Sequence, residues 1–203
     1  GFIGSVARGG AVNFTNVYFN PHGHGTHTEC LGHITKAAES INCIQLPLLV
    51  PCLLHTISPA NIQGDSVITI EHLPGGGFIE EKLPKAMIIR TLPNGESKKS
   101  KDWANTNPTY LHSDFTDKLV ERGVEHLLVD LPSVDKEIDG GTLLSHRAFF
   151  RVPEAPRTEA TITEFVFIPN EVQDGLYALN LQFAPFDLDA SPSRPVIYPL
   201  SVI

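Results

Sequence analysis

The sequence predicts a mixed α/β domain with a strand-rich core. Segments typical of strands outnumber segments typical of helices by about three to one. One helical segment, residues 114–122, is followed directly by an apolar, strand-like segment, residues 124–131, which is typical of an α/β unit. The 203 residues are enough for one domain with a proper core. We therefore expect residues 1–203 to form a single domain, and the abrupt start at Gly1 leads us to expect further residues before it.

Four strands are predicted in the first half of the chain, where β-branched, aromatic and apolar residues lie between turn residues. They cover residues 11–19, 48–57, 66–71 and 85–90. Pro51 should break the second strand, and the turn signal at 92–95 should end the fourth. Gly75-Gly-Gly77 predicts a flexible loop. The polar segment 96–108, which holds the single tryptophan, Trp103, predicts a long functional or mobile connection.

The second half combines two helices with further strands. Ser113 is placed to cap the helix at 114–122, which has Leu111, Phe115 and Leu119 on one face and ends at Gly123. A second, short helix is predicted within residues 141–150. The predicted strands are 124–131, 161–167, 176–183 and 195–203.

Composition and charge exclude several classes of protein. The net charge is −8, and the densest basic run is only Lys98-Lys99-Ser100-Lys101, so a nucleic-acid partner is not expected. The longest apolar run, residues 46–54, is too short to cross a membrane and contains two prolines. Three cysteines without metal-type spacing predict reduced thiols in a cytoplasmic protein.

Histidines are concentrated in one stretch. Of nine in the chain, four lie within twelve positions: His22, His24, His27 and His33. Glu29 lies among them, and imidazoles with a carboxylate suit zinc, manganese or iron. A histidine-rich surface loop or an expression tag are the alternatives, but tags are terminal and uninterrupted. The stretch therefore predicts a metal site.

This stretch resembles the signature His-x-Gly-Thr-His-x-Asp-x-Pro-x-His of the cyclase family of metal-dependent hydrolases, which includes bacterial kynurenine formamidase and isatin hydrolase. Gly25-Thr26-His27 matches, Glu29 stands at the aspartate and His33 at the last histidine. The resemblance continues in matching order from about Ala11 to the end. The further matching segments are 107–110, 129–135, 145–150, 163–172 and 193–197.

Three departures place the chain in a divergent branch of that family. Gly23 stands where the family has its first histidine, and His22 and His24 flank it, so the sequence leaves open which of them is the ligand. Glu29 replaces the family's aspartate and lengthens the ligand arm by one methylene. Residues 30–32 replace a proline-containing link, and the interval between His146 and Glu164 is longer.

The resemblance implies a fold, a site and an activity. The fold is a swivelling β/β/α-type domain. One or two divalent ions, Zn or Mn, are implied on ligands drawn from His22 or His24, His27, Glu29, His146 and Glu164. His33 is implied as the proton carrier. The implied enzyme is a metal-dependent amidohydrolase that cleaves a non-peptide C–N bond in a small amide, formamide or lactam through metal-activated water. A homodimer or homotetramer is also implied.

A second hypothesis is a non-catalytic cyclase-fold protein that binds a metal or ligand without turnover; the altered first histidine favours it. Taken singly, the candidate residues also have ordinary interpretations: His33 as a loop histidine, His146 as a core histidine and Glu164 as a solvent-facing strand residue. Ser133 and Asp135 are expected to fix their loop by local hydrogen bonds. Trp103 either covers an aromatic substrate or packs against the fold.

Overall fold

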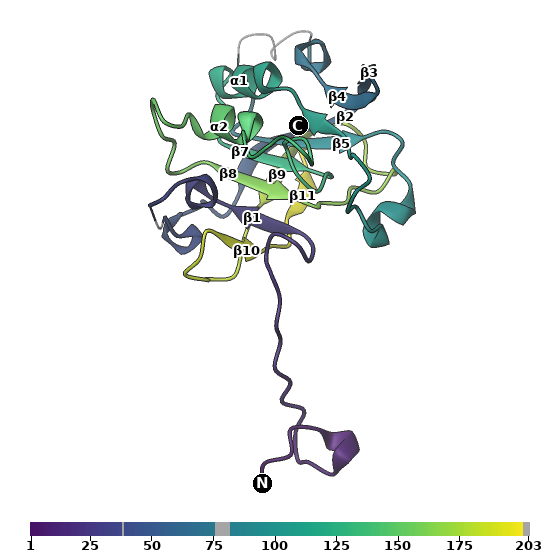
Figure 1. Cartoon of the computed structure of the whole chain (residues 1–203), viewed down its shortest axis with the longest axis vertical. Coiled ribbons are helices and arrows are strands. Elements are labelled where there is room, and N and C mark those ends of the chain that lie inside the picture. Colours follow the sequence, from purple (N-terminus) through teal and green to yellow (C-terminus); the bar gives the residue numbers. More distant parts are fainter. Residues whose placement is uncertain (38, 76–81, 201–203) are drawn as a thin grey trace.

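The structure, a computed structural model, describes residues 1–37, 39–75 and 82–200. A curved sheet of eight strands forms its body, and an N-terminal arm extends from it (Figure 1). In spatial order the strands are β10 (Ala190–Pro192), β1 (His27–Glu29), β8 (Thr161–Glu164), β7 (His126–Val129), β5 (Ala86–Thr91), β2 (Val50–Ile57), β9 (Gly175–Asn180) and β11 (Val196–Pro199).

The centre of the sheet is parallel and its two flanks are antiparallel. Strands β8, β7, β5 and β2 pair in parallel, whereas β1, β10, β9 and β11 join through antiparallel ladders. Parallel strands are usually covered on both faces and therefore apolar along their length. Accordingly, all six residues of β5 are buried. The antiparallel pair of β1 and β8 lies next to this centre and carries the candidate site.

A smaller sheet and two α-helices complete the described part of the chain. The small sheet contains β3 (Ala60–Ile62), β4 (Asp65–Ile68) and β6 (Tyr110–Leu111), and the helices are α1 (Ser113–Glu121) and α2 (Leu144–Phe150). The 3-10 turns are η1 (Val6–Arg8), η2 (Leu31–Ile34), η3 (Ile41–Cys43), η4 (Ile70–His72) and η6 (Glu96–Ser100). Each helix within the described residues is too short or too polar to span a bilayer.

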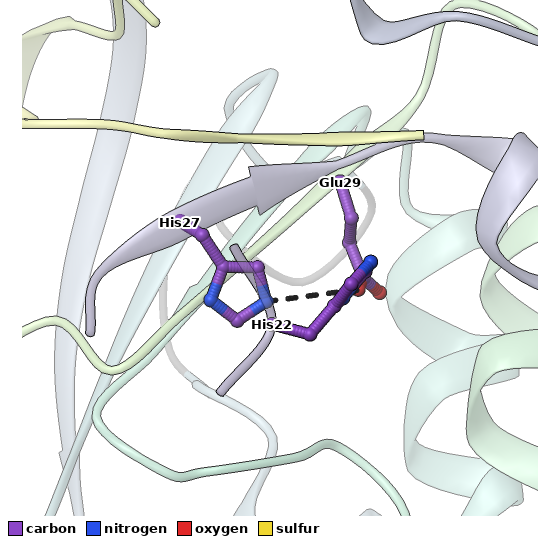
Figure 2. A group of neighbouring side chains, drawn as sticks. All are labelled: His22, His27 and Glu29. Atoms are coloured by element: carbon purple, nitrogen blue, oxygen red, sulfur yellow. Dashed lines mark ion pairs between the residues drawn. The ribbon is translucent and has the colours of Figure 1, made fainter. Parts of the chain in front are cut away.

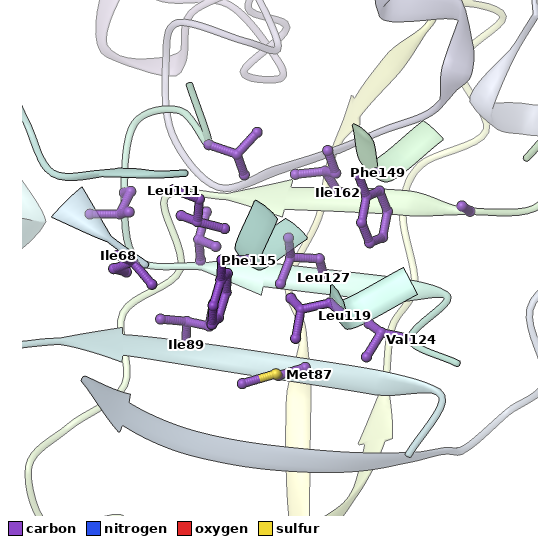
Figure 3. Packing of buried hydrophobic residues seen from close by; sticks show 14 of the residues in the cluster. Ile68, Met87, Ile89, Leu111, Phe115, Leu119, Val124, Leu127, Phe149 and Ile162 are labelled. Atoms are coloured by element: carbon purple, nitrogen blue, oxygen red, sulfur yellow. The ribbon is translucent and has the colours of Figure 1, made fainter. Parts of the chain in front are cut away.

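The main core lies between the two α-helices and one face of the large sheet. Figure 3 shows Phe115 and Leu119 of α1 and Phe149 of α2 against Met87 and Leu127 of the strands. All five side chains are fully buried. Removing such large apolar side chains from water is the main favourable term in folding, about 1.5–3 kcal/mol each. The opposite face holds a second cluster, which contains Val50, Leu54, Ile88, Leu128 and Leu179.

The predicted mixed, strand-rich α/β class is confirmed. The predicted strand at 11–19 is wrong: these residues form the exposed arm, because no strand lies beside them to accept their hydrogen bonds. Side chains of this arm are open to solvent, with Phe14 69%, Val17 75% and Tyr18 89% exposed. A β-type sequence forms a strand only where a partner is in place.

Other local predictions need correction. Pro51 does not break β2, because the parallel ladder to β5 begins only at Cys52 and Pro51 faces Ala178 of β9. Ser113 does not cap α1; His112 does, since its Nδ1 accepts from the Asp114 N–H at 3.3 Å. Of the predicted glycine loop, residues 76 and 77 lie outside the described residues, as do residues 201–203 of the last predicted strand.

Candidate metal centre

Strand β1 presents two potential ligands on one face. His27 and Glu29 are two residues apart, and side chains at this spacing point to the same side of a strand. In the pairing with β8, His27 lies opposite Glu164, so a third potential ligand joins the same face. His27 and Glu29 are completely buried and Glu164 is 4% exposed. Two carboxylates and an imidazole therefore meet in the interior, where unpaired charge is costly.

The orientation of His27 is set by the backbone before it. Its Nδ1–H donates to the carbonyl oxygen of Gly25 at 2.9 Å, which leaves Nε2 to face Glu29 and Glu164. Gly25 has a φ of +137°, a conformation that residues with a Cβ rarely adopt. The Gly-Thr-His sequence thus builds a turn that aims one ring nitrogen into the cluster.

His146 enters from α2 and is held by two carboxylates. Its Nδ1–H donates to Asp135 Oδ2 at 2.6 Å, and its Nε2 lies 2.8 Å from Glu29 Oε1. Asp135 also accepts the backbone N–H groups of Ser145 and His146 at 2.6 and 3.2 Å. One carboxylate therefore fixes both the start of α2 and the ring orientation of His146, as is common for metal-binding histidines.

The more exposed side of the cluster is formed by two stacked histidines. The rings of His22 and His33 lie 4.2 Å apart. His22 Nδ1 lies 3.1 Å from Glu29 Oε2, and His33 Nε2 lies 3.8 Å from the same oxygen. Their other nitrogens lie 2.8 and 3.3 Å from Asp189 Oδ2. Figure 2 shows His27 and Glu29 on strand β1, with the side chain of His22 beside the Glu29 carboxylate.

Two buried atoms at the centre lack hydrogen-bond partners among the described residues: His27 Nε2 and Glu29 Oε2. Three imidazole nitrogens surround Glu29 Oε2 without a hydrogen bond: His22 Nδ1 at 3.1 Å is not aligned to donate to it, and Nε2 of His27 and of His33, both at 3.8 Å, are too far away. Buried polar atoms are rarely left without a partner. Imidazole nitrogens and a carboxylate oxygen are also the donors that zinc and manganese take. The residues present therefore fit a divalent ion.

Potential ligand atoms gather in three overlapping groups, in each of which the atoms lie within 4.8 Å of one another. The groups are His22 with His27 and Glu29, His22 with His33 and Asp189, and Glu29 with His33 and His146. Glu29 belongs to two of them.

The pKa values show an environment that attracts cations. Burial alone would lower the pKa of His27, but the carboxylates of Glu164 and Glu29 outweigh it and raise the pKa to about 10. The pKa of His146 is likewise raised despite its burial, chiefly by the charge of Glu29. Burial and the charge of Glu29 raise the pKa of Glu164. Without a metal ion, these carboxylates therefore hold protons on the neighbouring histidines, and a divalent cation can take the place of those protons.

The structure brings together six of the seven candidate site residues: His22, His27, Glu29, His33, His146 and Glu164. The seventh, His24, is exposed and belongs to none of the three groups found among the described residues. Its Nδ1 accepts the N–H of Asn20 at 3.1 Å instead. The two residues flanking Gly23 therefore take different positions, and His22 lies at the cluster.

Two functional side chains were not identified from the sequence. Asp135 was expected to serve its own loop, and its N–H does donate a local bond to Ser133 Oγ at 3.2 Å, but its carboxylate holds His146. Asp189 lies 156 residues from His33 along the chain, and its sequence surroundings carry no metal-type spacing. Only the fold brings it beside the histidines.

The departure at residues 30–32 has a packing reason. A Cβ on Gly32 would lie 2.1 Å from the backbone oxygen of Glu39, so glycine is required where η2 packs against the following segment. This close contact positions His33, the next residue. The glycine therefore fixes the path of the chain within the link that contains a proline in the family signature, one position after Leu31, which stands at that proline.

A protein-family model, described as "Putative cyclase", matches residues 5–136. The chain belongs to this family. It is 27% identical over 198 residues to a kynurenine formamidase of Bacillus cereus, covering 97% of this chain and 85% of that protein. A kynurenine formamidase of Bacillus mycoides is 25% identical over 197 residues, with the same coverage.

Solved structures of cyclase-family type share the fold. A potential metal-dependent hydrolase with cyclase activity superposes with a TM-score of 0.68 and 16% identity, covering 90% of this chain and 81% of that one. Isatin hydrolase A from Labrenzia aggregata, bound to benzyl benzoate, gives a TM-score of 0.66 and 15% identity, covering 93% and 77%. The prediction of a divergent member of the cyclase family is confirmed.

Proposed function

We propose that this cyclase-family protein is a metal-dependent hydrolase acting on a small amide, formamide or lactam. The observation that carries the proposal is Glu29 Oε2, a buried oxygen without a hydrogen-bond partner among the described residues, surrounded by three imidazole nitrogens. The relatives named kynurenine formamidase and isatin hydrolase support a reaction at a non-peptide C–N bond. The donor set favours Zn or Mn, as one or two ions.

The chain's own residues divide the work between holding the ion and moving a proton. His22, His27 and Glu29 hold the ion, and His146 and Glu164 complete the site or hold a second ion. When bound, the ion supplies a Lewis acid and lowers the pKa of a water molecule toward about 7. The buried carboxylates keep His27 and His146 oriented, so the donor atoms are in place before the ion binds.

His33 is proposed as the proton carrier. Its ring is 29% exposed, its Nε2 faces Glu29, and its Nδ1 lies 3.3 Å from Asp189. Asp189 therefore holds the proton on Nδ1 and leaves Nε2 to take a proton from the attacking water and give it to the leaving nitrogen. The same distances also allow His33 to bind the ion directly, because two of the three ligand groups contain it.

The first experiment measures metal content by elemental analysis and turnover of N-formyl aromatic amines, lactams and lactones with and without chelator. We expect one or two ions per chain and chelator-sensitive hydrolysis. In the His33→Ala variant we expect retained metal and lost turnover; loss of metal would make His33 a ligand. Unchanged turnover in that variant would overturn its proposed role. Metal without turnover of any compound would favour the non-catalytic alternative.

We also propose that the protein is a homo-oligomer, a dimer or tetramer, in the cytoplasm. The exposed arm supports association, because Phe14, Val17 and Tyr18 offer an apolar strand-like segment to another chain. Three free cysteines support a reducing compartment. Sedimentation equilibrium tests the assembly: we expect a dimer or larger, and a shift toward monomer when Val17 and Tyr18 are changed to serine. A monomer across the micromolar range would contradict the proposal.

A further inference from the structure

The stacked rings of His22 and His33 have two edges, and each edge faces one carboxylate. On the inner edge, His22 Nδ1 and His33 Nε2 lie 3.1 and 3.8 Å from Glu29 Oε2. On the outer edge, His22 Nε2 and His33 Nδ1 lie 2.8 and 3.3 Å from Asp189 Oδ2. Two imidazole nitrogens around one carboxylate oxygen therefore occur twice. We name the second set, His22 Nε2, His33 Nδ1 and Asp189 Oδ2, the outer donor group.

The spacing within the outer donor group fits a zinc-type ion. Its three atoms lie within 4.8 Å of one another. Two ligand atoms bound tetrahedrally at ordinary zinc distances are about 3.3 Å apart. The separations of 2.8 and 3.3 Å between the ring nitrogens and Asp189 Oδ2 are close to that value. Imidazole nitrogen and carboxylate oxygen are also donors that zinc accepts. An ion can therefore enter with only small side-chain movements.

The carboxylate of the outer donor group is fixed in place by the fold. Asp189 directly precedes β10, which pairs with β1. Its carbonyl oxygen accepts the N–H of Cys30 at 2.9 Å. A Cβ on Gly32 would lie 3.2 Å from the Cβ of Asp189, so the two backbones are in close contact. Asp189 is thus tied to the segment that carries His33, and the donors face each other before any ion binds.

The two edges differ in access and in pairing. Glu29 is fully buried, whereas the side chains of His22, His33 and Asp189 are 26%, 29% and 36% exposed, so a hydrated ion can reach the outer edge. Glu29 Oε2 has no hydrogen-bond partner among the described residues, but Asp189 Oδ2 is within hydrogen-bond distance of both rings. An ion at the outer edge must replace these hydrogen bonds. We therefore expect it to bind more weakly than an ion at Glu29.

His22 belongs to both edges but serves one ion at a time. A neutral imidazole has one nitrogen with a lone pair and one nitrogen with a proton. When Nδ1 of His22 holds an ion beside Glu29, its Nε2 carries the proton and can only donate to Asp189. The outer ion is then held by His33, Asp189 and water. These two residues therefore decide whether the outer edge binds a metal.

We propose that His33 and Asp189, with His22 when its ring is free, form a second and weaker site for zinc-type divalent ions, and that an ion bound there inhibits the enzyme. Asp189 lies outside the ligand set that the cyclase resemblance implies. His33 enters the site through Nδ1, the nitrogen beside Asp189, and not through Nε2, which faces Glu29. The inhibition rests on the proposed function, because it acts on the proposed proton carrier; the binding site itself does not.

An ion on His33 Nδ1 changes the tautomer of the ring. In the active form the ring proton is on Nδ1, beside Asp189, and Nε2 has the lone pair that takes a proton from water. Coordination uses the lone pair of Nδ1, so the single ring proton moves to Nε2. The ring stays neutral and no proton is gained or lost. Nε2 is then a donor without a lone pair, and it cannot accept a proton from the attacking water.

Zinc binding to the full-length protein tests the site without any turnover. The protein is stripped with chelator and titrated with zinc chloride in a calorimeter. We expect the tight ions to bind first, followed by one further ion of weaker affinity. Asp189→Asn should weaken this further ion about tenfold and leave the number of tight ions unchanged. Weak binding that is the same in Asp189→Asn and wild type would overturn the site.

Two control variants identify zinc bound elsewhere on the surface. Asp187→Asn changes an exposed aspartate two positions before Asp189, and His24→Gln changes the exposed histidine two positions after His22. Both should bind the weak ion with wild-type affinity. Loss of the weak ion in either control, together with its retention in Asp189→Asn, would place the ion outside the outer donor group and overturn the proposal.

Nitrogen NMR of isotope-labelled histidine side chains reports the tautomer directly. We expect the His33 proton on Nδ1 when only the tight ions are bound, and on Nε2 with excess zinc. Asp189→Asn should show no such change at the zinc concentration that saturates wild type. A proton that stays on Nδ1 of His33 while the weak ion is bound would overturn the mechanism of inhibition.

Turnover of formanilide against zinc concentration separates this inference from the proposed function. We expect wild-type turnover to rise as the tight ions bind and then to fall at least about tenfold as the weak ion binds. Magnesium, which takes oxygen ligands, should not inhibit. Asp189→Asn should retain its own maximal turnover at excess zinc.

The outcomes of the kinetic and binding experiments are distinct. Zinc inhibition of equal strength in Asp189→Asn and wild type would overturn the inference alone. A weak ion that depends on Asp189, without hydrolysis of any N-formyl amine, lactam or lactone, would overturn the proposed function and support the site.

Discussion

Two buried carboxylates at strand ends differ in how completely they are paired. Asp130, just after β7, is 3% exposed and accepts from the Thr91 N–H, the Thr91 hydroxyl and Lys98 at 2.8–2.9 Å. Glu29, at the end of β1, is fully buried, and among the described residues only its Oε1 has a hydrogen-bond partner, His146. Burial is the same, but the pairing is not.

This difference separates a structural cluster from a candidate binding site. At Asp130 every carboxylate oxygen is matched by a fixed donor, so the cluster ties the segment after β5 to the sheet and has no capacity for a ligand. At Glu29 the partners are imidazoles that can exchange a proton for a metal ion. Incomplete pairing inside an otherwise well-packed protein therefore indicates where a cation belongs.

The largest effect is expected at Glu29. Glu29→Gln keeps the shape of the side chain but removes the charge and one acceptor, so metal affinity should fall at least about 100-fold and hydrolysis with it. In wild type, metal at 100 times its Kd should stabilise the fold by about 2.7 kcal/mol. Calorimetry and thermal unfolding with added zinc or manganese measure both effects. Glu125→Gln, a surface glutamate paired with Lys85, should behave as wild type.

At Asp130 the expected effect is on stability alone. Asp130→Asn leaves the Lys98 ammonium, whose side chain is 12% exposed, without its counter-charge. Unfolding free energy should fall by about 3 kcal/mol, in the range seen when one partner of a buried pair is removed. Urea unfolding measures the loss, and elemental analysis should find the wild-type metal content. If metal were lost as well, the separation of the two clusters would be wrong.

The buried histidine His126 extends the same comparison to pH. The ring of His126 shares a hydrogen bond with Thr161 Oγ1 and has no carboxylate partner in the part of the chain that the structure describes. Burial, with Arg157 and Lys85 nearby, lowers its pKa to about 4. In the unfolded chain this histidine takes up a proton below about pH 6.5. Between pH 6.5 and 4 the unfolded state therefore binds more protons than the folded state, and the unfolding free energy decreases as the pH is lowered. This contribution amounts to about 3 kcal/mol at pH 4.

The variant His126→Gln removes that titration. Its unfolding free energy should depend less on pH between 6.5 and 4 than that of wild type, by about the same 3 kcal/mol. Urea midpoints across this pH range, with chelator present in every sample, provide the measurement. Parallel curves for the two proteins would show that His126 is not the group responsible.

The smallest effect is expected at Asp135, which acts on the centre through His146. Asp135→Asn keeps one acceptor for the start of α2 but removes the negative charge that faces His146 Nδ1, so metal affinity should fall about tenfold. Competition with a fluorescent chelator measures the change. Asp139→Asn is a suitable control, because Asp139 accepts the Gly141 and Leu143 N–H groups and does not contact His146. Equal losses in the two variants would assign the effect to the loop rather than to His146.

The sequence by itself determined the fold class and most of the site. The apolar residues of the strands and of α1 recur with the period of a strand or a helix. This periodicity is local, and every residue of a segment contributes to it. The His27–Glu29 spacing needs only the two-residue repeat of a strand to place both side chains on one face. The other candidate residues, His33, His146 and Glu164, were predicted because their order along the chain resembles that in the cyclase family.

Only the tertiary structure shows that His22 lies at the cluster, beside Asp189 and Glu29, whereas His24 contacts the Asn20 N–H. The same holds for Asp135 and Asp189, whose carboxylates meet histidines 11 and 156 residues away. Residues 11–19 show the reverse case: a strand-like sequence that forms no strand because it has no neighbour. Hydrogen bonds between distant segments depend on where the chain folds back, and local sequence carries no record of that.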